Sequence, residues 1–261
     1  MFRIFYYNEN IDISLIAVEV EEEIVHMQNS KKITRFKKIS VWLFVIIVGF
    51  ICYVLSQIFF QMGSWGGYQG VNLTIVGLIQ ALLILPLIYF GLKQMGIKKE
   101  KIGISSKNLG RDALVGICVA ISWAILQFVW LIPSTGGADR KDIAQILTMI
   151  DGQWMNVLWY IPLGIIGGGI TEEIYNRGFF IGAINETFDH SKLALWIAAI
   201  ISILFFVAGH LPTNFVEWVD LLIPTIAYTL MFLSTKRLTA SIVAHGLWNT
   251  LAVVLIYIIY A

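Results

Sequence analysis

Charged side chains are scarce in this chain: they make up 13% of its 261 residues, whereas 58% of the residues are hydrophobic. A soluble domain typically has about 25% charged and about 45–50% apolar residues. The composition therefore argues against an ordinary soluble domain and predicts a polytopic membrane protein that forms a single domain.

Two other features are also missing. No basic patch with interleaved aromatic residues is present, so we expect no binding to nucleic acid. The two cysteines, Cys52 and Cys118, fall in apolar runs and indicate small packed side chains without informing on a disulfide. The first long apolar run begins near Ser40 and covers about 22 residues, longer than the roughly 7–15 of a signal peptide, so we expect no cleavable signal.

Seven stretches have the length that a bilayer requires, about 19–25 mostly apolar residues each. They are 40–62, 71–92, 112–133, 157–182, 193–211, 216–235 and 238–260. We therefore predict an all-α, polytopic membrane helix bundle of about seven transmembrane helices. Residues 1–39, with an acidic run at 19–23 and a basic run at 31–38, are predicted to be a juxtamembrane segment, and 40–261 the transmembrane domain.

Lysine and arginine are unevenly shared between the two sets of loops. One set, before the first span and after each even-numbered one, holds Lys31, Lys32, Arg35, Lys37, Lys38, Lys93, Lys98, Lys99, Lys101, Lys107, Arg111, Lys192, Lys236 and Arg237. The other set offers only Arg140 and Lys141. Because cytoplasmic loops carry the excess of basic residues, we predict a cytoplasmic N-terminus and Ala261 on the other side.

Adjacent glutamates interrupt the fourth span, where an ionisable side chain costs at least a few kcal/mol and needs a partner or a function. Glu173 and Arg177 are four residues apart on a helix, so they share a face and can pair. Glu172 points about 100° away and is left free to face the bundle interior, as a candidate general base. The glycines at 167–169 allow a close approach of helices. The alternative is a purely structural ion pair that fixes helix register.

Two later spans carry histidines. His210 follows Phe206 by four residues, and His245 precedes Asn249 by four, so each pair shares one helix face. Alone, His210 is typical of a structural residue, and His245 with Asn249 suits helix–helix contacts as well as catalysis. Together with Glu172, however, they supply a base for water and donors for an oxyanion, which a peptide-bond hydrolase needs.

The order of these residues resembles the three motifs of the CAAX protease and bacteriocin-processing family, also called Abi or type II CAAX prenyl endopeptidase-like intramembrane proteases. The resemblance covers about residues 110–255. The motifs are Glu172-Glu173-x-x-x-Arg177, Phe206-x-x-x-His210 and His245-x-x-x-Asn249.

The resemblance implies an intramembrane endopeptidase in a bacterial cell membrane, with its site open towards the cytoplasmic leaflet. It implies that Glu172 and His210 activate water, that His245 and Asn249 stabilise the oxyanion, and that the Glu173–Arg177 pair supports the site. The implied substrate is a membrane-associated peptide or protein: a prenylated tail, a leader peptide, or a bacteriocin or pheromone precursor.

The depth of the two histidines sets a geometric condition. At about 1.5 Å per residue, His245 lies about 10 Å and His210 about 25 Å from the cytoplasmic ends of their helices. They can meet only if the fifth helix is tilted, begins later or enters at another depth.

A metal is not required by the spacing. Glu172, His210 and His245 could form a zinc site with one open position, but no His-Glu-x-x-His motif is present. We favour the mechanism without a cofactor, and zinc remains the alternative.

Two other functions stay open. A non-catalytic bacteriocin self-immunity protein would retain the motifs as structural residues. A transporter or proton relay would also place Glu and His in the membrane, although no inverted repeat is visible.

Overall fold

The computed structural model describes the backbone of residues 13–261 and the side chains of residues 34–261 except Ser64. All regular secondary structure in this part of the chain is helical, which confirms the all-α prediction. Of the predicted juxtamembrane segment, residues 1–12 and the side chains up to residue 33, including the acidic run, lie outside the description. From Ile13 onward the segment is helical and continues into the first span as one helix, α1 (Ile13–Gln61).

Six helices in the described chain are long and apolar enough to cross a membrane. Each matches one of the seven predicted spans to within several residues. They are Thr34–Gln61 of α1, α2 (Val71–Met95), the run Leu109–Ser134, α8 (Lys192–Gly209), α9 (Phe215–Thr235) and α10 (Thr239–Tyr260). The run Leu109–Ser134 consists of α3 (Leu109–Leu126), η3 (Gln127–Leu131) and α4 (Ile132–Ser134).

The predicted fourth span, 157–182, is helical but differs in form. It lies in a run made of α6 (Trp154–Pro162), the π-helices η5 (Leu163–Glu172) and η6 (Ile174–Gly182), and α7 (Ala183–Thr187). The π-helix begins directly after Pro162, which has no amide hydrogen and so interrupts the α-helical hydrogen bonds. Thr171 Oγ1 also donates to the carbonyl of Ile166, five residues back. Single π turns are frequent at functional sites, and two π segments flank Glu173 here.

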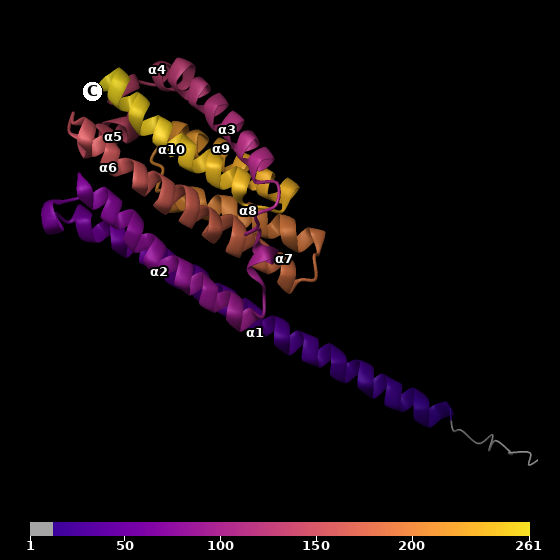
Figure 1. Cartoon of the computed structure of the whole chain (residues 1–261). Helices are drawn as coiled ribbons and strands as arrows, with labels where there is room; N and C mark the ends of the chain where they lie inside the picture. The colour runs from indigo at the N-terminus through magenta and orange to yellow at the C-terminus, as the bar shows by residue number, and fades with distance from the viewer. Residues whose placement is uncertain (1–12) are drawn as a thin grey trace, which may run out of the picture.

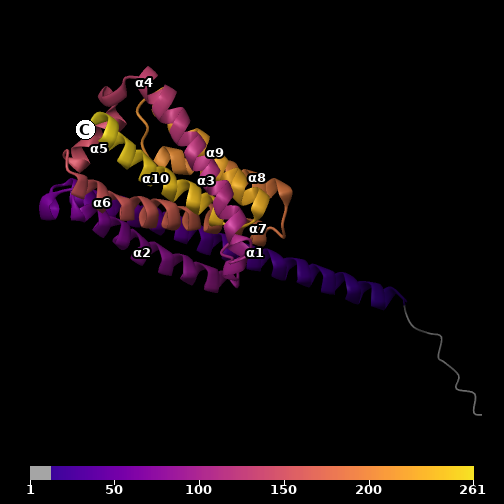
Figure 2. The ribbon, with the colours of Figure 1, turned by 45° about the horizontal axis from the view of Figure 1, so that its top comes forward.

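This π-helical run lies between α2 and α10 (Figures 1 and 2). Glycines bring the backbones together as expected. A Cβ at Gly77 of α2 would lie 2.9 Å from Leu163 Cα, and one at Gly169 would lie 2.7 Å from Gly246 Cα of α10. Such contacts between small residues are a main source of helix association in membranes.

The two ends of the bundle differ in charge. At one end, which we call the basic end, ion pairs join Arg35 to Asp189, Lys101 to Glu186 and Arg237 to Asp112. At the opposite end lie the link between α1 and α2, α4, α5 (Lys141–Ile150) and the C-terminus (Figures 1 and 2). There the Trp154 ring lies 5.3 Å from that of Tyr257.

We predict that Gly169→Ala destabilises the protein, because its methyl group would overlap the α10 backbone; overpacking typically costs about 1–3 kcal/mol. Gly110→Ala in α3 is the matched control, since a Cβ there meets open space. Thermal unfolding in detergent should show a lower Tm for the first variant alone. Equal Tm values would contradict the close packing described above.

Candidate active site

Glu173 is the most enclosed group of the site, with a side chain that is 0% exposed. Its Oε1 accepts a hydrogen bond from Arg177 Nη1 at 2.9 Å and lies 2.9 Å from His245 Nδ1. The predicted Glu173–Arg177 pair is therefore present. The contact with His245 was not predicted, because it joins residues 72 positions apart on two different helices.

Aromatic rings of α8 and α9 surround the two cationic partners of Glu173. The Arg177 guanidinium lies 4.7 Å from the centre of the Phe206 ring and 5.7 Å from that of Tyr228. The imidazole of His245 stacks on Tyr228, with ring centres 5.1 Å apart and planes 22° apart. Sequence reasoning missed Tyr228, because a tyrosine in a transmembrane span carries no distinctive signal.

Glu172 follows a different direction from Glu173. Its side chain is 17% exposed and lines a cavity, and its Oε2 lies 3.9 Å from His245 Nε2. One imidazole therefore faces two carboxylates, with Nδ1 bound to Glu173 and Nε2 turned towards Glu172. A gap of 3.9 Å is longer than a hydrogen bond and leaves the pair unbonded without an intervening group.

The cavity has a volume of about 650 Å³. Its inner wall is largely aromatic and its mouth is largely polar. The inner residues include Tyr53, Glu172, Tyr175, Asn176, Phe205 and Phe206, and the mouth includes Gln57, Gln61, Tyr68, Lys141, Asp142, Gln145 and His210. Asn176 Oδ1 and the Tyr53 hydroxyl are buried without a hydrogen-bond partner.

His210 caps the end of α8 and is exposed on the cavity wall. Its Nδ1 lies 2.8 Å from the carbonyl oxygen of Phe206. The Phe206 ring centre is 4.5 Å from the His210 ring and 6.0 Å from the His245 ring. The two histidines lie at different depths, as predicted. The ring of Phe206 is a neighbour of both imidazoles.

Asn249 lies one turn beyond His245 on α10 and does not line the cavity. Its Nδ2 donates to the carbonyl of Gly164 at 3.0 Å. A Cβ at Gly168 would lie 2.4 Å from Asn249 Nδ2 and 3.5 Å from His245 Nε2. Glycine at 168 therefore leaves the space that both side chains occupy.

The zinc alternative concerns Glu172, His210 and His245. Within residues 34–261, no group of three or more His, Cys, Asp or Glu side chains is placed to hold a metal ion. Of these three residues, His245 has its Nδ1 bound to Glu173.

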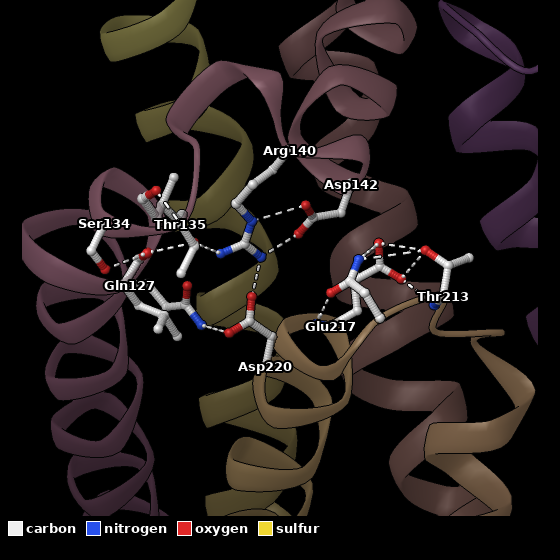
Figure 3. A network of polar contacts seen from close by, with 11 residues as sticks. Gln127, Ser134, Thr135, Arg140, Asp142, Thr213, Glu217 and Asp220 are labelled. Atoms are coloured by element: carbon white, nitrogen blue, oxygen red, sulfur yellow. Dashed lines mark hydrogen bonds and ion pairs between the residues drawn. The ribbon is translucent and has the colours of Figure 1, made fainter.

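A polar network that the sequence did not reveal is shown in Figure 3, and one of its residues, Asp142, also lines the cavity mouth. Arg140 donates to Asp142 at the start of α5, to Asp220 of α9 and to Thr135. Gln127 donates to Asp220 at 3.0 Å. Burial alone would lower the pKa of Arg140, but the bonds that it donates to Asp142 and Asp220 outweigh burial and raise it. The network ties η3, α5 and α9 together next to a hollow of about 160 Å³ that His210 helps to line.

The fold and site define a multi-pass helical membrane protein with carboxylates and imidazoles enclosed in its bundle. Residues 154–251, which contain all three motifs, match the family model for Type II CAAX prenyl endopeptidase Rce1-like proteins. The match over this region confirms the predicted resemblance to the CAAX protease and bacteriocin-processing family. Comparisons with curated proteins and with solved structures give no match.

Arg177→Met should destabilise the protein strongly, because it leaves the buried Glu173 with one partner fewer; removing one member of a buried pair costs about 3–5 kcal/mol. Adding Glu173→Gln should recover part of this loss by removing the buried charge. Unfolding in detergent at graded denaturant measures both changes. Lys107→Met, an exposed change of the same type at the basic end, is the control. Equal losses in the single and double variants would show that the ion pair is not the cause.

Proposed function

We propose that the protein is an intramembrane endopeptidase that hydrolyses a peptide bond of a membrane-associated protein or peptide. The observation that supports this most strongly is the position of Glu172. Its carboxylate borders a cavity large enough for a peptide segment, and an oriented imidazole lies 3.9 Å away. The family match over residues 154–251 supports the same class of reaction.

The proposed reaction begins when Glu172 accepts a proton from a water molecule in the cavity, assisted by His210 on the cavity wall. The resulting hydroxide adds to the carbonyl carbon of the scissile bond, and an oxyanion forms. The proton held by Glu172 then passes to the nitrogen of the leaving amine as the C–N bond breaks. A carboxylic acid product and an amine product result, and the enzyme is regenerated.

His245 is proposed to stabilise the oxyanion. The Glu173 carboxylate accepts a hydrogen bond from Nδ1–H of His245, which fixes the orientation of the ring and stabilises positive charge on it. Nε2 is then directed towards the space beside Glu172. Asn249, whose Nδ2 donates to the Gly164 carbonyl, is proposed to hold the backbone next to this space.

We propose that the protein lies in a bacterial cell membrane and that its substrate is a polypeptide that reaches the site from that membrane. The inner aromatic wall suits an aliphatic or aromatic side chain next to the scissile bond, and the polar mouth suits an extended backbone. These features do not depend on a prenyl group or a metal.

Glu172→Gln should reduce cleavage at least 100-fold, since loss of a general base typically costs about 10²–10⁴-fold in rate. Glu100→Gln, the same change at an exposed position of the basic end, should cleave normally. The measurement compares, by mass spectrometry, peptides from cells expressing each variant at equal membrane abundance. Identical profiles for Glu172→Gln and wild type would contradict the proposal, and protection against a bacteriocin by that variant would favour the immunity function.

Substitutions of the two histidines should differ in their effect on stability. His245→Ala removes a buried partner of Glu173, so it should lower both cleavage and Tm. His210→Ala removes an exposed side chain, so it should lower cleavage with little change in Tm. Paired assays of cleavage and thermal unfolding test this. Normal cleavage by His210→Ala would remove it from the mechanism.

A further inference from the structure

The structure brings the basic residues of separate loops to one end of the bundle. The ion pairs of Arg35, Lys101 and Arg237 join α1, α7, α3 and the segments between them at the basic end. The Leu238 amide also donates to the Gly103 carbonyl, so the link between α9 and α10 packs on the segment after η2 (Lys99–Ile102). The other basic residues of these loops lie in the same short segments. They are Lys37, Lys38, Lys93, Lys98, Lys99, Lys107, Arg111, Lys192 and Lys236.

The cavity opens at the other end. Its mouth is formed by Gln57 and Gln61 at the end of α1, by Lys141 and Gln145 of α5, and by His210 after the end of α8. All of these lie where α1 and α8 finish, the full length of a span away from Arg35 and Lys192. The cavity that Glu172 lines therefore opens at the end of the bundle that is poor in lysine and arginine.

Between Glu172 and the basic end the bundle is closed. Phe179, Phe180 and Ile181, one to two turns beyond the glutamates, are each at most 2% exposed. A Cβ at Gly178 would lie 3.1 Å from the Ile102 carbonyl oxygen, and one at Gly182 would lie 3.0 Å from Ile102 Cα. The segment η2 thus packs directly on η6 on that side of the site.

We propose, on the basis of the function proposed above, that the active-site cavity opens on the non-cytoplasmic side of the membrane. The basic end is the cytoplasmic one, because short loops rich in Lys and Arg are retained in the cytoplasm. The substrate is then the outer juxtamembrane segment of a transmembrane or lipid-anchored polypeptide. A cytoplasmic opening, which the family resemblance implies, is incompatible in this fold with the orientation that the basic residues indicate.

The mouth has the polar character that this substrate requires. Lys141 and Asp142 place one charge of each sign there, and Gln57, Gln61 and Gln145 add amide donors and acceptors. An extended peptide leaving the outer leaflet could exchange hydrogen bonds with water for bonds with these side chains as it enters. Aromatic residues further in then meet its side chains. A cytoplasmic prenylated C-terminus is excluded as the substrate by this placement.

The first test measures orientation and is independent of catalysis. In a Cys52→Ser/Cys118→Ser background, single cysteines are introduced at the cavity end (Gln61→Cys, Lys141→Cys) or the basic end (Lys98→Cys, Lys107→Cys). Intact bacterial cells are treated with a membrane-impermeant maleimide, and inverted vesicles serve as the matched sample. Each variant must retain the background Tm, and two sites at each end guard against loss of one variant.

We expect both cavity-end cysteines to react in intact cells and both basic-end cysteines to react only in inverted vesicles. The reverse pattern, or reaction of both ends in intact cells, would overturn the proposal.

The second test joins orientation to activity. Two model substrates carry the same cleavable sequence next to one transmembrane helix, placed on the outer side in one and on the cytoplasmic side in the other. Cleavage of the outer-side substrate alone, abolished by Glu172→Gln, is expected. Cleavage of the cytoplasmic substrate alone would overturn the orientation while supporting the protease. If a sequence taken from the cellular peptide comparison is cut on neither side, the proposed function fails, whatever the labelling shows.

Discussion

The buried carboxylate of Glu173 is the interaction on which the site depends. A charge at this depth is tolerated only with partners, and it has two, Arg177 on its own helical run and His245 on α10. These contacts fix the rotation of one helix against the other. They also leave Glu172, the preceding residue, pointing into the cavity, so that one glutamate is enclosed in the bundle and the other lines the cavity.

Glycine makes this placement possible. Gly167, Gly168 and Gly169 lie against Gln80 of α2, the Asn249 and His245 side chains, and Gly246 of α10, respectively. Larger side chains at these positions would push α2 and α10 away from the π-helical run. Close backbones bring the imidazole of His245 within reach of both carboxylates, and the aromatic rings of Phe206 and Tyr228 fill the remaining space.

Much of this could be predicted from the sequence. Apolar length located six spans, since each must bury about 20 residues in lipid, and helix periodicity paired Glu173 with Arg177. Periodicity could not show the contact between Glu173 and His245, because distance along the chain says nothing about which helices pack together. It also could not predict the π-helix, whose hydrogen bonds depend on Pro162 and on packing. From the sequence, Arg140 is indistinguishable from an ordinary charged loop residue. In the structure it is only 8% exposed and links Asp142 to Asp220.

The π-helical form of the run after Pro162 has a consequence for how the site can change. Each π turn accommodates one residue more than an α turn, so it shifts the phase of everything that follows relative to what precedes it. The direction of the Glu172 carboxyl is therefore set by accumulated helix phase as well as by its own position. A substitution that restores α-helical hydrogen bonding near Pro162 would rotate both glutamates together and change the direction of the Glu172 carboxyl without altering a single side chain of the site.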